Sequence, residues 1–396
     1  MASGKDVPRI VHLADTISSS VARIREVLSA KGIPPPSFDE DASFNVPAEV
    51  ANEHDAVLDA TAELHDLLLE PLSLIHRHAG HNNAVCLQAI AEFKIADLVP
   101  LNGQIKFCDI ASQTPMTEDM TARLLRHAMI MRVFREPEPG MVAHTTASRT
   151  LSHSAANDWL RSGTREMWPA ATKMVDALKK WPKSQELNQT VSPHNSSNDT
   201  ASTHASYQGF ALSNGGSTTI YDIFAKDAER ASQWVRGMEI FTQRPQFSLS
   251  YVTEHYDWKG LGRAQVVDMG GSQGHVSLAL ARRFDNLSMV VQNIEGNAGN
   301  ATAPEELRER VTFMTHDLFA PQPVQGAEVY FSRWILHTWS DKYCILILRA
   351  LIPALKNGAR IIIQDTLMPK PGTMALWKEK NLRFVRADMK FRVGMR

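Results

Sequence analysis

Apolar residues recur at helical spacing along the first third of the chain. After the proline turn at residues 34–36, Leu58, Ala62 and Leu64 place an apolar stripe on one face of a helix. We expect residues 1–82 to form a helical segment that packs against a second subunit. The same spacing continues from residue 83 and predicts a helix that ends before Pro100. Its apolar positions are Val85, Leu87, Ile90, Phe93, Ile95 and Leu98.

A further helix and a short hairpin are expected next. Thr114 and Thr117 are both suitable N-caps for a helix whose apolar residues lie between 124 and 131. Two short segments, 133–136 and 141–145, then flank a Pro-Glu-Pro-Gly turn that is typical of a β-hairpin. Helix, helix and hairpin together predict a winged helix over residues 83–165.

The next part of the chain has few apolar residues. Residues 190–208 are rich in Ser, Thr and Asn and offer little apolar surface to offset the entropy cost of ordering. We therefore expect residues 166–250 to be linking helices with a disordered insertion near 190–208.

From about residue 251 the pattern changes to short apolar runs that alternate with helical segments. Runs such as Met289-Val290-Val291 and Ile361-Ile362-Ile363 are typical of strands covered on both faces of a parallel sheet. Residues 251–396 are therefore expected to form a doubly wound, Rossmann-like α/β domain. We expect strands at 264–268, 288–292, 311–316, 327–331 and 360–364, and helices at 276–284 and 340–351.

Composition and charge indicate which classes of partner the chain can bind. The 396 residues include 43% hydrophobic and 21% charged residues, with a net charge of −1. A winged helix can bind DNA through basic residues such as Arg123, Arg126 and His127, but these are too few in a neutral chain to hold a nucleic acid. The first residues show no apolar stretch of the kind expected in a secretory leader, and no later stretch reaches eighteen uninterrupted apolar residues. Neither a nucleic-acid nor a membrane partner is expected, and the expected location is the cytoplasm.

Metal and redox sites receive little support from the sequence. The three cysteines, Cys86, Cys108 and Cys344, are far apart, which fits a reducing compartment. Three histidines cluster at residues 76, 78 and 81 without an acidic neighbour, and a solvated helix end explains them better than a metal site. We expect no bound metal.

A glycine turn follows the first strand of the α/β domain. Gly270, Gly271 and Gly274 stand where a strand passes into a helix, a position where the backbone can approach a ligand closely. The spacing is not G-x-G-x-x-G, and no basic residue in the turn could bind a pyrophosphate. Asp268 could face an ammonium group or orient the turn. These features suit S-adenosylmethionine better than a dinucleotide, although a tight strand-to-helix connection without a ligand is the alternative.

Polar side chains end the next strands at the same edge of the sheet. Asn293 could bind ribose hydroxyls, Asp317 could accept from the adenine amino group, and Leu318 could pack on the adenine ring. Arg333 ends the following strand and completes the predicted cofactor site. Capping of strands and helices is the simpler alternative for these residues.

With these motifs in view, residues 80–390 resemble S-adenosylmethionine-dependent O-methyltransferases of the plant caffeate and fungal secondary-metabolite type. The resemblance rests on Arg-Trp-Ile-Leu-His-Thr-Trp-Ser-Asp at 333–341 and Gln-Asp-Thr-Leu-Met-Pro at 364–369. It implies that His337 is the general base that deprotonates a substrate hydroxyl and that Asp365 steadies it. It also implies a homodimer, an N-terminal dimerisation domain, and a phenolic or enolic hydroxyl of a small secondary metabolite as substrate. Near neutral pH a histidine can accept such a proton.

The sequence departs from the family pattern in three places. Asn293 replaces the usual Asp, and Thr338 replaces an Asp after the histidine. Family members also continue beyond residues 387–389 through a second acid, a helix and two closing strands, so we expect a C-terminally shortened sheet. These departures keep a second hypothesis open, a catalytically impaired homologue that acts as a binding or partner subunit. A third, an NAD-dependent oxidoreductase, rests only on the sheet and the glycines.

Overall fold

The structure is a computed structural model that describes residues 7–180, 209–215, 223–224, 226–242, 247–294, 301–339, 341–365 and 370–380. Contacts divide the chain into two units, Met1–Arg165 with Pro369–Val385, and Glu166–Met368 with Arg386–Arg396. The insertion expected near 190–208 lies outside the described residues.

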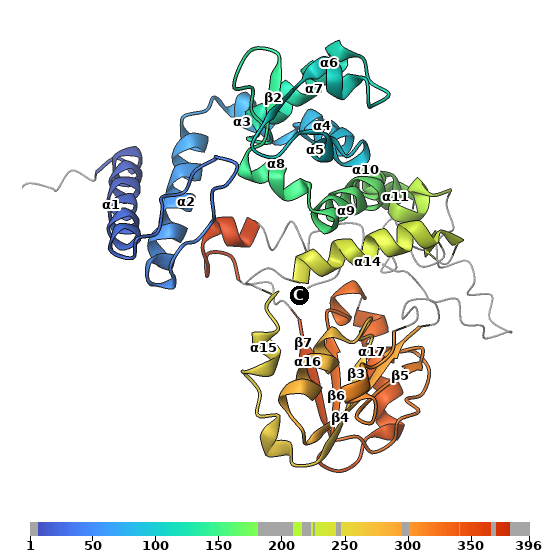
Figure 1. The fold of residues 1–396 in the computed structure, drawn as a ribbon. Helices are drawn as coiled ribbons and strands as arrows, with labels where there is room; N and C mark the ends of the chain where they lie inside the picture. Colours follow the sequence, from blue (N-terminus) through green and yellow to red (C-terminus); the bar gives the residue numbers. More distant parts are fainter. Residues whose placement is uncertain are drawn as a thin grey trace, which may run out of the picture. The chain divides into compact units, whose positions relative to one another are not determined.

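The first unit is mainly helical, as the sequence predicted (Figure 1). Its two longest helices, α1 and α2, pack against each other. A short helical turn of residues 376–380 also belongs to this unit and is held by α2, where Asp59 accepts the backbone N–H groups of Leu376 and Trp377 at 2.7 and 2.8 Å. The helices are α1 (Arg9–Ala30), α2 (Ala51–Leu67), α3 (Pro71–His78), α4 (His81–Glu92), α5 (Ile95–Leu98), α6 (Phe107–Ala111), α7 (Glu118–Ile130), α8 (Thr146–Leu151) and α9 (Ser154–Ser162).

Two details of the predicted winged helix need correction. The expected single helix from residue 83 is broken into α4 and α5 at Lys94, which adopts a left-handed conformation with φ of 50°. Of the two suggested caps, Thr117 is the N-cap of α7, with its side chain accepting from Met120 N.

The expected hairpin is also different. The segment Met141–Ala143 does form a strand, β2, but its antiparallel partner is β1 (Gln104–Lys106), which the sequence pattern did not predict. Residues 133–136 contribute only an isolated bridge from Arg135 to Ala143. The sheet of this unit therefore joins segments that lie on either side of α6 and α7.

The second unit contains a five-stranded parallel sheet of order β5-β4-β3-β6-β7. All five strands lie within two residues of their predicted positions. The strands are β3 (Ala264–Met269), β4 (Leu287–Asn293), β5 (Val311–Thr315), β6 (Val329–Arg333) and β7 (Arg360–Gln364). The helices of this unit are α10 (Trp168–Thr172), α11 (Met174–Lys180), α12 (Gly209–Ser213), α14 (Ala228–Thr242), α15 (Ser250–Thr253), α16 (His275–Arg283) and α17 (Asp341–Leu351).

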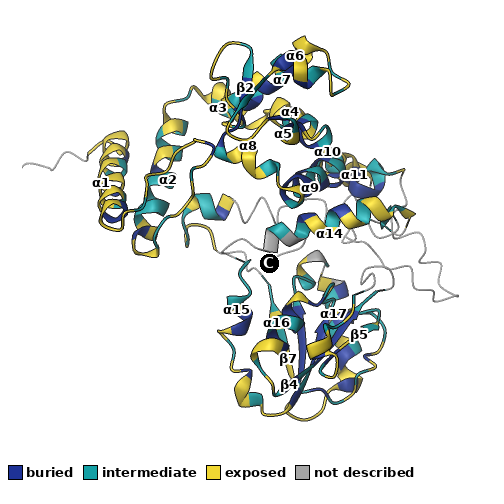
Figure 2. Ribbon diagram, in the orientation of Figure 1, coloured by how far each residue is buried: buried dark blue, intermediate teal, exposed yellow. Residues whose placement is uncertain are grey.

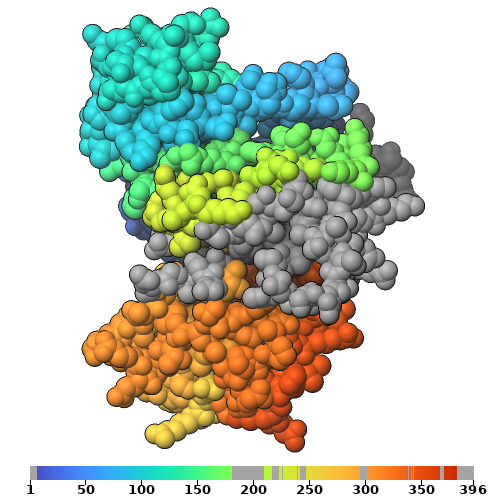
Figure 3. Space-filling model, turned by 90° about the vertical axis from the view of Figure 1, so that its right-hand side faces the viewer, coloured from blue at the N-terminus to red at the C-terminus, as the bar shows by residue number. Residues whose placement is uncertain are grey.

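Side chains that alternate along each strand pack into two hydrophobic cores, one on each face of the sheet. Val266 and Phe331 pack with Leu280 of α16, whereas Val267 and Tyr330 pack with Leu351 of α17. This is the period of two expected for strands covered on both faces. The central strands are accordingly buried in Figure 2, and residues from about 250 to 365 form a closely packed body in Figure 3.

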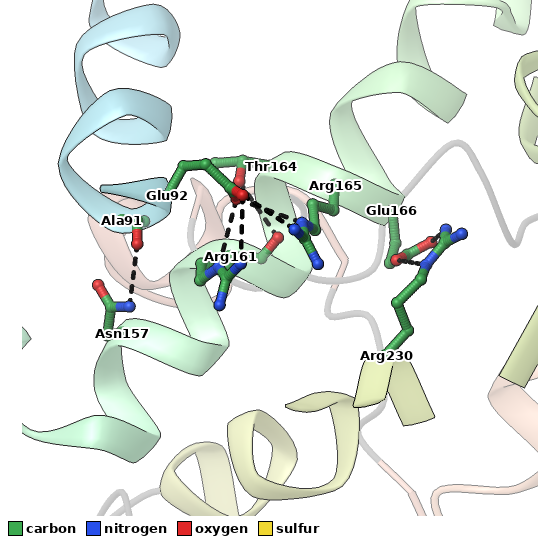
Figure 4. Close-up of polar contacts among 8 residues, drawn as sticks. All are labelled: Ala91, Glu92, Asn157, Arg161, Thr164, Arg165, Glu166 and Arg230. Carbon is green, nitrogen blue, oxygen red and sulfur yellow. Dashed lines mark hydrogen bonds and ion pairs between the residues drawn. The ribbon is translucent and has the colours of Figure 1, made fainter. Parts of the chain in front are cut away.

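Ion pairs are formed by residues on both sides of the chain position, between residues 165 and 166, where the first unit ends and the second begins (Figure 4). The carboxylate of Glu92 on α4 accepts hydrogen bonds from Arg161 at 3.2 Å and from Arg165 at 2.9 Å, all within the first unit. The next residue, Glu166, pairs with Arg230 of α14 at 2.6 Å within the second unit. Arg165 and Glu166 both lie in a π-helical turn of residues 163–167. Arg165 is therefore paired within the first unit and the adjacent Glu166 within the second.

Candidate active site

The glycine turn connects β3 to α16, as predicted. Gly270 and Gly274 have φ values of 76° and 75°, in the left-handed region that favours glycine. Gly271 is required for a different reason. A Cβ atom there would lie 2.6 Å from Oδ2 of Asp268 and 2.8 Å from Cγ1 of Val291. The glycine at 271 thus makes room for the side chains of Asp268 and Val291, and its contact with a ligand stays a prediction.

Asp268 is buried at the end of β3, on the face covered by α16. Its Oδ2 accepts a hydrogen bond of 2.6 Å from the hydroxyl of Ser277. Burial raises the pKa of Asp268 from 3.8 to about 6, although the Ser277 bond and the charge of Arg333 act in the opposite direction. A carboxylate whose cost of burial is only partly offset by hydrogen bonds and neighbouring charges is typical of a functional site.

Arg333 ends β6 on the neighbouring strand. Its Nη2 donates to the backbone oxygen of Phe247 at 2.6 Å, and its guanidinium lies 4.2 Å from the ring centre of Trp334. Burial lowers the pKa of Arg333, while the charge of Asp268 partly offsets this. The Nε atom is buried and has no hydrogen-bond partner among the described residues. This donor is suited to a polar group of a ligand.

Asn293 and Asp317 also lie at the carboxyl ends of neighbouring strands. The backbone N–H of His316 donates to the oxygen of Asn293 at 2.8 Å, which holds the two strand ends together. Each side chain has a capping bond, from Ile294 N to Asn293 and from Phe319 N to Asp317, both 3.1 Å. Leu318 packs against the core on the α17 face. The structure brings the predicted set to one edge of the sheet.

His337 and Asp365 meet at the far side of the same edge. Nδ1 of His337 lies 2.7 Å from Oδ1 of Asp365, and the His337 backbone N–H donates to Oδ2 at 3.1 Å. The imidazole side chain remains 34% exposed, so its other nitrogen is not sealed into the core. This carboxylate–imidazole pair has the arrangement of a general base with an orienting acid.

Three contacting residues were not predicted from the sequence. Ser277 binds Asp268, and Gln292 and Gln322 pair with each other beneath the strand ends. A usable signal did exist for Gln292, because an amide inside the apolar run of β4 needs a buried partner. Its partner lies 30 residues away and has no local signature.

The described residues fit a nucleoside ligand without phosphate. The glycine turn, the buried Asp268, the unpartnered Nε donor of Arg333 and the polar strand ends lie around one edge, and the turn contains no basic residue. Within the described ranges no group of three or more His, Cys, Asp or Glu side chains is placed to hold a metal ion. No described helix combines the length and apolarity that a bilayer crossing requires.

Comparisons with known proteins identify the family of this chain. Residues 200–389 match the O-methyltransferase domain, and residues 77–154 match the O-methyltransferase dimerisation domain. The chain is 42% identical to O-methyltransferase PaMT of Phomopsis amygdali, over 96% of this chain and 86% of that protein. It is 33% identical to chlorophenol O-methyltransferase of Trichoderma longibrachiatum, over 96% and 80%.

Solved structures share the fold. OxaC, crystallised in complex with SAH and oxaline, superposes with a TM-score of 0.74 at 16% identity, over 98% of this chain and 91% of that one. Motifs, fold and relatives therefore lead to one conclusion, that this chain belongs to the family of S-adenosylmethionine-dependent O-methyltransferases.

Proposed function

We propose that this chain methylates a phenolic or enolic hydroxyl of a small secondary metabolite, with His337 as general base. The observation that carries the proposal is the 2.7 Å contact between His337 and Asp365 beside the predicted cofactor site. Chlorophenol and grayanic acid cluster O-methyltransferases are among the relatives, at 33% and 34% identity, which supports a phenolic substrate.

One set of residues is proposed to bind the cofactor. When bound, S-adenosylmethionine supplies an electrophilic methyl group on a sulfonium sulfur. Asp268, Gly270, Gly271, Gly274 and Arg333 would hold its amino-acid side, while Asn293, Asp317 and Leu318 would hold its adenosine.

His337 acts on the acceptor. With Nδ1–H directed at Asp365, the Nε2 atom is left as the proton acceptor for the substrate hydroxyl. Deprotonation makes the oxygen a stronger nucleophile, and holding it close to the methyl group provides much of the acceleration.

We also propose that the protein acts as a homodimer. The dimerisation domain match supports this, as does α3, which has no buried residue. Leu72 and Ile75 on this helix and Leu68 shortly before it are 69%, 67% and 70% exposed. Light scattering should give twice the chain mass, and Leu72→Asp with Ile75→Asp should shift the mass toward the monomer. A monomeric wild type would contradict this part of the proposal.

The test of the activity is transfer of a tritiated methyl group from S-adenosylmethionine to a panel of phenols, chlorophenols and enolic diketones. We expect label in at least one acceptor, as an ether. A folded protein that binds the cofactor but labels none of them would contradict the proposal and favour a non-catalytic binding subunit.

A further inference from the structure

Two buried glutamines form a closed pair beneath the cofactor side of the sheet. Nε2 of Gln292 donates to Oε1 of Gln322 at 2.7 Å, and Nε2 of Gln322 donates back to Oε1 of Gln292 at 2.9 Å. Their exposed fractions are 0% and 1%, so water does not compete for these bonds. Two amides in such a ring fix both the distance and the relative orientation of the segments that carry them.

Those segments carry most of the predicted cofactor site. Gln292 lies on β4 directly before Asn293, and its own carbonyl oxygen accepts the backbone N–H groups of Gly270 at 2.9 Å and Gly271 at 3.1 Å. The turn that begins at Asp317 is closed by the backbone N–H of Ala320, which donates to the Asp317 oxygen at 3.0 Å, and Gln322 follows two residues later. Gln292 is thus bonded to the glycine turn through its backbone and, through its side chain, to Gln322 on the segment that follows Asp317.

The turn after β5 is tied to the pair at several atoms of Gln322. Its Oε1 also accepts from Val324 N at 3.0 Å, and its backbone N–H donates to Ala350 of α17 at 3.0 Å. The carbonyl oxygen accepts from Nε2 of Gln325 at 2.8 Å. Leu318 and Asp317 lie four and five residues before Gln322 on the same segment, so a shift of Gln322 would be passed to them along the backbone.

We propose that Gln292 and Gln322 are positioning residues for the cofactor, which set the gap between the ribose-binding end of β4 and the adenine-binding turn. The proposal rests on the proposed cofactor site. Neither amide side chain touches the ligand in this account. The pair acts through Asn293, Asp317 and Leu318, and small displacements of such groups weaken binding considerably.

Stability and positioning can be separated by an apolar replacement of both partners. Gln292→Leu or Gln322→Leu alone leaves one buried amide unpaired and should lower the melting temperature. The double variant Gln292→Leu/Gln322→Leu removes both polar groups, so its melting temperature should recover toward wild type. If the pair positions the site, cofactor affinity should not recover. Gln325→Leu is the matched control, because Gln325 is exposed and its side chain donates to the backbone oxygen of Gln322 and not to the paired amides.

The measurement is calorimetric titration of the full chain with S-adenosylhomocysteine and with methylthioadenosine, which carries adenosine without the amino-acid part. We expect the double variant to bind both ligands at least tenfold more weakly, and Gln325→Leu to bind as wild type does. In steady-state assays KM for S-adenosylmethionine should rise while kcat at saturation stays within about threefold. Wild-type affinity in the stable double variant would overturn the proposal.

If the double variant does not fold, a second variant tests the same proposal. Gln322→Asn keeps the amide but shortens its reach by one methylene, so it should weaken binding of both ligands severalfold. Unchanged affinity for both would also overturn the proposal. If wild type itself fails to bind S-adenosylhomocysteine, the proposed cofactor site has failed instead, so the two failures are distinguishable.

Discussion

His337 and Asp365 are joined by two contacts, the imidazole Nδ1 to Oδ1 at 2.7 Å and the His337 backbone N–H to Oδ2 at 3.1 Å. The register of the sheet produces both. Arg333 at the end of β6 lies opposite Gln364 at the end of β7, so the residues that follow each strand emerge side by side. The carboxylate therefore fixes both the loop that carries the imidazole and the tautomer of its ring.

Asp365→Asn should separate orientation from binding. The amide can still contact the loop, but it no longer favours the Nδ1–H tautomer or stabilises the protonated ring. We expect kcat to fall about 10²- to 10⁴-fold while the dissociation constant for S-adenosylhomocysteine changes less than threefold. Asp365→Glu should recover part of the rate. A loss of cofactor affinity as large as the loss of rate would show that Asp365 has another role.

Asp268→Asn should stabilise the ligand-free protein at alkaline pH. Burial raises the pKa of Asp268 from 3.8 to about 6, so above pH 6 the folded state holds a costly buried charge. A rise of this size corresponds to about 3 kcal/mol. As pH falls from 6 to 4 the folded state takes up the proton first, and the cost disappears.

Urea unfolding without ligand should show the pH dependence. The variant should be more stable than wild type by up to about 3 kcal/mol at pH 8, with the difference shrinking below pH 6. S-adenosylhomocysteine should bind the variant at least tenfold more weakly at pH 8. A variant that is less stable than wild type at pH 8 would contradict the assignment of Asp268 as a strained functional carboxylate.

Gly271→Ala should cost both stability and binding. The new methyl group would meet Asp268 at 2.6 Å and Val291 at 2.8 Å, and these neighbours must shift. We expect a loss of about 1–3 kcal/mol in the free energy of unfolding, with weaker S-adenosylhomocysteine binding because Asp268 moves. Gly163→Ala is the control, since nothing lies within 4 Å of its added Cβ. Equal melting temperatures for the two variants would refute the close packing at Gly271.

Glu92→Gln should destabilise the first unit. Burial raises the pKa of Glu92, but the hydrogen bonds from Arg161 and Arg165 outweigh it and lower the pKa overall. The variant leaves the Arg161 side chain, only 12% exposed, without its counter-charge. We expect a loss of about 1–2 kcal/mol in urea unfolding of the full chain. Asp119→Asn breaks an ion pair whose partners are 70% and 73% exposed, and should have no measurable effect. Equal losses in both variants would contradict this distinction.

The α/β part of the fold was accessible from the sequence because its signals are local. Runs such as Ile361–Ile363 mark strands buried on both faces, and the glycine turn marks the passage into α16. Parallel topology then brings the strand ends together, so the order of residues along the chain is enough to assign Asp268, Asn293 and Asp317 to one edge.

Pairings between distant segments could not be predicted in this way. The strand Gln104–Lys106 is too short to show an alternating pattern, and its partner is determined by how α6 and α7 fold between the two strands. Likewise, the pairing of Gln292 with Gln322 depends on the position of the segment after β5, 30 residues along the chain. Gly271 shows the same limit, since the sequence indicates that space is needed but not which atoms fill it.

The most direct test of the account is single-turnover transfer of a tritiated methyl group from bound S-adenosylmethionine to an accepted phenol, in wild type and in His337→Ala. The account predicts that the variant binds S-adenosylhomocysteine within about threefold of wild type but transfers the methyl group at least 10²-fold more slowly. His255→Ala, which removes another exposed imidazole, should transfer at the wild-type rate. Equal transfer rates in wild type and His337→Ala would contradict the assignment of His337 as the base.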